Sequence, residues 1–148
     1  MKNLEKGSKM KPLNNKEIKE INNKLENQFG VKKKLDYFFY INKENKIFLM
    51  SKNMQKLDLT KFRVNSFGLY FAKLEKDTIR LSLSGSQLIG EHVKKNVLEI
   101  EKKEDWLNGQ NLECNKELKG WFILKNKQDF LGCGFCKNGI IQNFIPKH

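Results

Sequence analysis

Two cysteines near the C-terminus stand three positions apart, as Cys133 and Cys136 in the stretch LGCGFC. A C-x-x-C pair can hold a zinc ion, exchange disulfides with another thiol, or simply pack as two small side chains. A structural zinc site needs four ligands, but Cys114, His92 and His148 form no second pair at ligand spacing. A thioredoxin-like site would place the motif at the start of a helix, after a strand.

The surrounding residues predict a β-hairpin instead. Residues 129–135 and 140–145 are strand-like, and Lys137 is followed by an Asn-Gly pair, the strongest short signal for a type I′ turn. Residues three apart on a regular strand point to opposite faces. We therefore interpret the thiols as packing residues, with zinc binding and redox exchange as alternatives, and we expect Leu131, Ile141 and Phe144 in the core.

Other catalytic patterns are weak. Ser84 and Ser86 flank a glycine but lack the G-x-S-x-G context of a nucleophile elbow. His92 is the one internal histidine, and no evident set of an acid and a nucleophile surrounds it in the sequence. Neither common Gly-rich phosphate loop is present. We expect a protein that is not an enzyme and needs no cofactor or metal.

The charge balance predicts a polyanionic partner. The chain of 148 residues carries 29 Lys and Arg against 17 Asp and Glu, a net charge of +12. Residues 1–75 hold 17 basic and 8 acidic residues (+9), and residues 76–148 hold 12 and 9 (+3). Such an excess favours nucleic acid or an acidic surface, although a merely Lys-rich soluble surface is the plain alternative. No stretch approaches the roughly 20 apolar residues of a membrane span. The odd number of cysteines, three, and the lack of a visible export signal favour a reducing, intracellular compartment.

The periodicity of apolar residues places a helix first and strands after it. Asn14 and Glu17 form a capping-box pattern, and Gly30 is in position to end the helix. Two aromatic-rich strands follow, separated by the turn-like residues 42–45. The second half alternates short strands with two short helices, one of them beginning at Ser84 or Ser86, and this pattern suits a compact barrel. We predict a basic tail over residues 1–11 and two domains over 12–75 and 76–148.

Five segments together resemble the Nip-seven family of ribosome-biogenesis factors. They are MKPLNNKEIKEI (10–21), KIFLMSKNMQKL (46–57), FGLYFAKLEKDTIRLSLSGSQLI (67–89), DWLNGQNL (105–112) and GWFILKNKQDFLGCGF (120–135). The resemblance implies an α+β fold: a small α/β pre-PUA domain followed by a PUA-like β-barrel. The final segment, from Leu131 onward, is also similar to the PUA-like module of RsmF-type rRNA methyltransferases.

The resemblance also implies where RNA binds. PUA domains grip RNA with their first strand, the following helix and the final strand. The resemblance maps this face here to Arg80, the SGSQLIG segment, Lys94 and Lys95, and the closing hairpin. Basic residues late in the family's PUA domain bind U-rich RNA, and their nearest counterparts here are Lys125, Lys127, Lys137 and Lys147. The predicted RNA-binding residues are Arg80, Lys94, Lys95, Lys125, Lys127, Lys137 and Lys147. A second basic surface is expected at Lys32, Lys33 and Lys34.

The predicted function is RNA binding in ribosome biogenesis or rRNA maturation, by a cytoplasmic protein in an archaeon or a nucleolar one in a eukaryote. The expected partners are rRNA or its precursor and ribosome-assembly proteins, with no membrane, and we expect a monomer. The alternative is a protein–protein adaptor in an assembly or RNA-processing complex that touches RNA incidentally. Direct phosphate contacts would make the affinity for RNA fall steeply as salt rises, whereas an adaptor would keep its protein partner at moderate salt.

Overall fold

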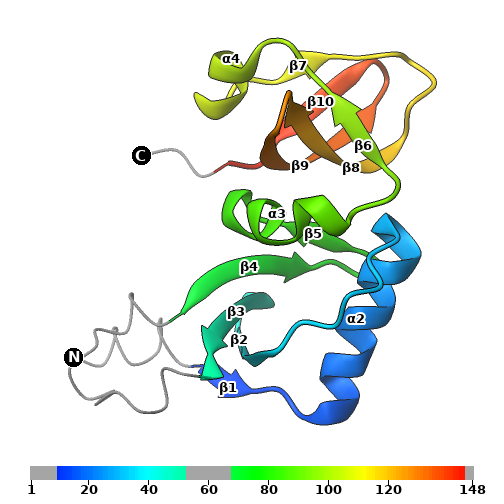
Figure 1. Ribbon diagram of the computed structural model, residues 1–148. Helices are drawn as coiled ribbons and strands as arrows, with labels where there is room; N and C mark the ends of the chain where they lie inside the picture. Colours follow the sequence, from blue (N-terminus) through cyan, green and yellow to red (C-terminus); the bar gives the residue numbers. More distant parts are fainter. Residues whose placement is uncertain (1–9, 53–67, 146–148) are drawn as a thin grey trace.

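The computed structural model describes residues 10–52 and 68–145. It is a mixed α+β protein built on two five-stranded sheets (Figure 1). The first sheet has the strand order β1-β2-β3-β4-β5 and the second the order β6-β8-β9-β10-β7. The predicted fold class is confirmed, with a small α+β half followed by a half that is built on a curved sheet.

The first sheet is antiparallel throughout. Its strands are β1 (Met10–Pro12), β2 (Tyr37–Asn42), β3 (Lys46–Ser51), β4 (Leu69–Leu74) and β5 (Ile79–Leu81). The predicted aromatic hairpin is confirmed as β2–β3, and an additional strand, β1, pairs with the outer edge of β2. Met10 and Lys11 therefore lie in a strand, where a tail was predicted. Pro12 is compatible with this position because an edge strand leaves one side unpaired.

Helix α2 (Asn15–Phe29) covers one face of the first sheet (Figure 1). The predicted capping box is confirmed: the Asn14 side chain accepts from the Glu17 N–H at 2.8 Å, and Glu17 accepts from the Asn14 N–H at 3.0 Å. Gly30 ends the helix in the left-handed conformation, with φ of 71°. The apolar stripe of the helix is buried against the sheet. The caps and the apolar periodicity of the sequence therefore predicted this helix correctly.

Helix α3 (Leu83–Ile89) and a short 3₁₀ turn η4 (Gly90–His92) lie between the two sheets (Figure 1). The helix begins earlier than predicted, because Ser82 is its N-cap and accepts from the Gly85 N–H at 2.8 Å. Ser86 is instead fully buried inside the helix, and its hydroxyl accepts from the Gly132 N–H of the second sheet at 2.8 Å. The serines of this segment therefore join both sheets to α3.

The second sheet is built around one long hairpin. Its strands are β6 (Val97–Glu99), β7 (Leu112–Glu113), β8 (Gly120–Asn126), β9 (Asp129–Lys137) and β10 (Ile140–Asn143). The strand β6 pairs with β8 in parallel, and the other pairs are antiparallel. Asn138 and Gly139 both have positive φ, 56° and 82°, which confirms the predicted turn between β9 and β10. Helix α4 (Lys103–Leu107) lies on the far side of this sheet (Figure 1).

Two apolar cores lie on opposite sides of the second sheet. The larger core contains residues of α2 and of the first sheet. It also contains Ile123 and Cys133 on the face of the second sheet that points towards the first, called the junction face here. The smaller core surrounds Trp106 of α4 on the far face. Strand β5, which we assigned to the second domain, pairs with β4 of the first sheet, and the division of the chain into two domains stays a prediction.

Candidate nucleic-acid interface

The two cysteines of the C-x-x-C pair lie on opposite faces of β9, as the strand interpretation predicts. Cys133 belongs to the larger core and Cys136 to the core around Trp106. The Sγ of Cys133 accepts from the Leu81 N–H at 3.3 Å. Burial raises the pKa of Cys133 to about 12, and burial together with a hydrogen bond to Cys114 raises the pKa of Cys136 to about 12. The raised pKa makes each thiol a weaker nucleophile at neutral pH, because the thiolate is the reactive form.

The predicted RNA-binding residue Arg80 projects from β5 into the junction between the sheets. Its guanidinium carbon lies 4.6 Å from the ring centroid of Phe144 and 5.7 Å from that of Trp121. Glu75 holds it in an ion pair with an N–O distance of 3.4 Å, and 16% of the side chain is exposed. A planar guanidinium stacks well on aromatic faces. These contacts hold Arg80 in one orientation beside two rings.

The rings around Arg80 form an aromatic cluster, defined here as Trp121, Phe135 and Phe144. Trp121 and Phe135 are opposite each other on β8 and β9, with ring centroids 5.0 Å apart. Phe144 follows β10 and lies 5.1 Å from Trp121. Phe144 is 40% exposed, so its predicted place in the core is wrong, while Leu131 and Ile141 are buried as expected. Aromatic faces of this kind are the surfaces on which unpaired bases stack.

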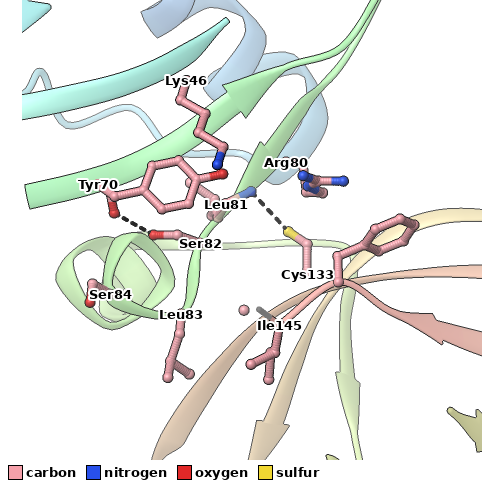
Figure 2. A pocket seen from close by; sticks show the side chains of 11 residues that line it. Lys46, Tyr70, Arg80, Leu81, Ser82, Leu83, Ser84, Cys133 and Ile145 are labelled. Atoms are coloured by element: carbon pink, nitrogen blue, oxygen red, sulfur yellow. Dashed lines mark hydrogen bonds between the residues drawn. The ribbon is translucent and has the colours of Figure 1, made fainter. Parts of the chain in front are cut away.

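A pocket of about 230 Å³ opens beside this cluster (Figure 2). Strand β5 and the start of α3 provide Arg80 and Ser82, and the residues that follow β10 provide Phe144. The opposite wall comes from the first sheet, through Lys46 of β3 and Tyr70 of β4. The Ser82 hydroxyl donates to the Tyr70 carbonyl, which fixes this wall to the start of α3 (Figure 2). The pocket thus combines two cations, two aromatic rings and a hydroxyl.

The structure gathers the three segments that the resemblance implied, but it does not gather the predicted lysines there. Lys46 is the lysine that lines the pocket among the described residues, and sequence reasoning missed it. Lys94 and Lys95 lie in the connection between α3 and β6, where their N–H groups donate to the Phe29 carbonyl at 2.8 and 3.3 Å. Their exposed side chains flank the end of α2.

The remaining predicted lysines are spread over the second sheet. Lys125 lies over the ring of Phe130 at 5.1 Å from its centroid. Lys127 occupies the β8–β9 turn with φ of 57°, and its N–H donates to Glu99 at 2.8 Å. Lys137 is exposed at the end of β9, and Lys147 lies outside the described residues.

The predicted second basic surface is exposed and lies beside α2. Lys32, Lys33 and Lys34 follow the end of the helix, and together with Lys19 they line a groove along it. None of these four lysines is among the residues that line the pocket at Arg80. The two basic regions are therefore separate sites in the described part of the chain.

Comparison with known proteins supports this geometry. Residues 10–84 match the model of the NIP7/UPF0113 pre-PUA domain, and residues 94–148 match that of the methyltransferase RsmF PUA domain. A hypothetical protein from the hyperthermophilic archaeon Pyrococcus horikoshii OT3 has a similar structure, with a TM-score of 0.54 and 13% identity over 88% of this chain and 84% of that one. No curated protein matches the chain. Among the described helices, none is long and apolar enough to cross a bilayer.

Proposed function

Because this chain belongs to the family of the NIP7/UPF0113 pre-PUA domain, we propose that it is a non-catalytic RNA-binding protein of ribosome biogenesis. The match to the RsmF PUA domain supports RNA binding by the second half, since it concerns a PUA domain and not the catalytic part of a methyltransferase. The proposed ligand is rRNA or its precursor, inside the cell.

The observation that carries this proposal is the contact of Arg80 with the aromatic cluster beside a pocket whose lining combines cations with aromatic rings. A guanidinium edge can donate to a phosphate or a base, while the neighbouring rings offer faces for stacking. Phe144 leaves 40% of its surface exposed, and this part of the ring is open to an unpaired base. RNA binding accounts for both features.

The test is fluorescence anisotropy of the full chain with a labelled single-stranded 12-mer of uridine, over a range of salt concentrations. Arg80→Ala should raise Kd about tenfold, the loss expected for one charged hydrogen bond of ~1.4 kcal/mol. Arg80→Lys keeps the charge and loses the planar stack, so its Kd should lie between that of the unaltered protein and that of Arg80→Ala. Lys102→Ala removes an exposed cation from the far face and should leave Kd unchanged. Absence of binding by the unaltered protein at low salt would refute the proposal.

One observation favours the adaptor role as a second candidate. A groove of about 620 Å³ on the far side of the second sheet is lined by Glu99, Glu101, Asp105 and Glu113 over an apolar floor. Phosphates would be repelled there, whereas a lysine-rich segment of a ribosome-assembly protein would find opposite charge. A partner that remains bound at a salt concentration that releases RNA would support this role.

A further inference from the structure

The first sheet carries a row of cations across three neighbouring strands. Lys46 of β3 lies opposite Lys73 of β4, and Lys73 lies opposite Arg80 of β5. Residues that are directly opposite on paired strands project from the same face of the sheet. Strands are about 4.8 Å apart, so the row advances by one cation per strand. It ends at Arg80, the residue that stacks on the aromatic cluster.

A pair of aromatic side chains lies on the same face beside this row. Phe48 is opposite Tyr70, with ring centroids 5.5 Å apart and planes tilted by 38°. The Nζ of Lys46 lies 5.4 Å from the centroid of Tyr70. A shift of register between Ile47 and Phe48 produces this pairing, and it leaves Phe71 fully buried in the core. The outer face of the first sheet therefore presents half-buried rings beside cations.

The three cations of the row outnumber the carboxylates that pair with them in the described part of the chain. Glu75 pairs with Arg80 at 3.4 Å, and Glu44 pairs with Lys46 at 3.6 Å. Within the described ranges, Lys73 has no carboxylate at ion-pair distance. Glu44 is largely exposed, and exposed pairs of this kind contribute little and exchange readily. The row thus retains positive charge that an incoming phosphate can use.

The pocket connects this face to the aromatic cluster, because its lining includes Lys46 and Tyr70 of the first sheet (Figure 2) as well as Phe144 of the cluster. Its volume of about 230 Å³ is below the range of roughly 300–1,000 Å³ that holds a drug-sized ligand. The space suits one part of a larger ligand, such as a single base whose neighbours lie outside. A base can enter such a pocket when it is unpaired.

We propose that the outer face of the first sheet is a second half of the RNA site and that it binds single-stranded RNA. The phosphates follow Arg80, Lys73 and Lys46, and one unpaired base enters the pocket between Tyr70 and Phe144. This inference rests on the proposed RNA-binding function and extends it from the PUA half to the pre-PUA half. The two halves then bind one strand jointly.

The first test replaces the two lysines of the row in the full chain, as the double variant Lys46→Gln and Lys73→Gln. With the labelled 12-mer of uridine, Kd should rise about tenfold at moderate salt. The slope of log affinity against log salt should fall in magnitude by about 1.4, since each lost phosphate contact on a single strand removes ~0.7. The matched control, Lys102→Gln with Lys116→Gln, removes equal charge from exposed positions of the second half and should keep the original slope.

The outcomes separate this inference from the function on which it rests. If the unaltered protein fails to bind, the function itself is wrong. If it binds and Arg80→Ala weakens it, while the row variant keeps the original Kd and slope, the function stands and the inference is overturned. Thermal melting of each variant checks that the fold is retained.

A second measurement locates the base directly. A uridine 12-mer with one 4-thiouridine is crosslinked to the full chain by light, and the modified peptides are identified by mass spectrometry. We expect crosslinks to the peptides that contain Tyr70 and Phe144. A duplex of the same sequence should compete at least tenfold more weakly than the single strand. Crosslinks confined to the lysines of the second sheet, or equal competition by the duplex, would contradict the proposal.

Discussion

The two faces of the second sheet show how the same strands can serve stability on one side and binding on the other. On the far face, Trp106 is completely buried and its indole N–H donates to the Leu131 carbonyl at 2.8 Å. On the junction face, Ile123 and Cys133 are also buried, but the edge of that face ends in the aromatic cluster beside Arg80. A closed core needs no ligand, whereas an open aromatic edge provides one with stacking surfaces.

A β-bulge between β8 and β9 changes which face some residues of β9 enter. The register between β8 and β9 shifts between Ile123 and Lys125, and Gly132 has a φ of 80°. A left-handed residue in a strand is the conformation that glycine adopts without strain. Leu131 and Cys133 consequently enter different cores, although residues two apart on a regular strand would share a face.

The largest expected effect is on the closed face. Trp106→Ala should lower the free energy of unfolding by about 3–5 kcal/mol, since it leaves a large cavity and removes a buried hydrogen bond. Phe144→Ala, at the open edge, should cost less than about 1 kcal/mol because the ring is already partly in water. Denaturant titration followed by circular dichroism measures both values. A similar cost for the two variants would show that the open edge is part of the stabilising core.

The next effect compares two glycines that face different neighbours. A Cβ on Gly85 of α3 would lie 2.0 Å from the Phe71 carbonyl oxygen, whereas one on Gly134 of β9 would lie 2.5 Å from a methyl of Ile141. Backbone cannot move aside as easily as a side chain. We expect Gly85→Ala to cost about 3 kcal/mol and Gly134→Ala about 1–2 kcal/mol, by the same titration. A larger cost for Gly134→Ala than for Gly85→Ala would show that packing around β9 is tighter than the contact of α3 with the first sheet.

The smallest effect is a dependence of stability on alkaline pH. The pKa of Cys133 is about 12 in the folded protein because of burial, against a usual value of 9.0. The unfolded state therefore loses this proton first, so stability falls as pH rises from about 9 towards 12. The advantage of the unaltered protein over Cys133→Ala should shrink by about 1 kcal/mol between pH 9 and pH 10. An unchanged difference between the two would mean that water reaches this thiol in the folded state.

Features that depend on neighbours in the sequence could be predicted from it. The capping box of α2 and the Asn138-Gly139 turn each rest on residues within a few positions, and the opposite faces of Cys133 and Cys136 follow from their spacing on one strand. The resemblance to a family supplied the three segments around Arg80. These predictions needed no knowledge of which strands pair.

The rest of the site depends on register, which local chemistry does not specify. Lys46 and Tyr70 meet Arg80 because of the pairing of β3, β4 and β5 and the shift after Ile47. Phe144 was misplaced because it follows the end of β10, where the alternation of the strand no longer applies. The lysines of the second sheet were selected as the nearest basic counterparts of the family's late basic residues, and a position in the sequence says nothing of which side chains lie close together.

The connection between the halves has a consequence for how the molecule melts. The N–H groups of Lys94 and Lys95 donate to the Phe29 carbonyl, and the Asn96 side chain donates to the Gln28 carbonyl at 2.6 Å. The same helix end packs into a core that also contains Ile123 and Cys133. Loss of either half would expose apolar surface of the other. Unfolding is therefore expected to be a single cooperative event, in which neither half survives as a folded intermediate.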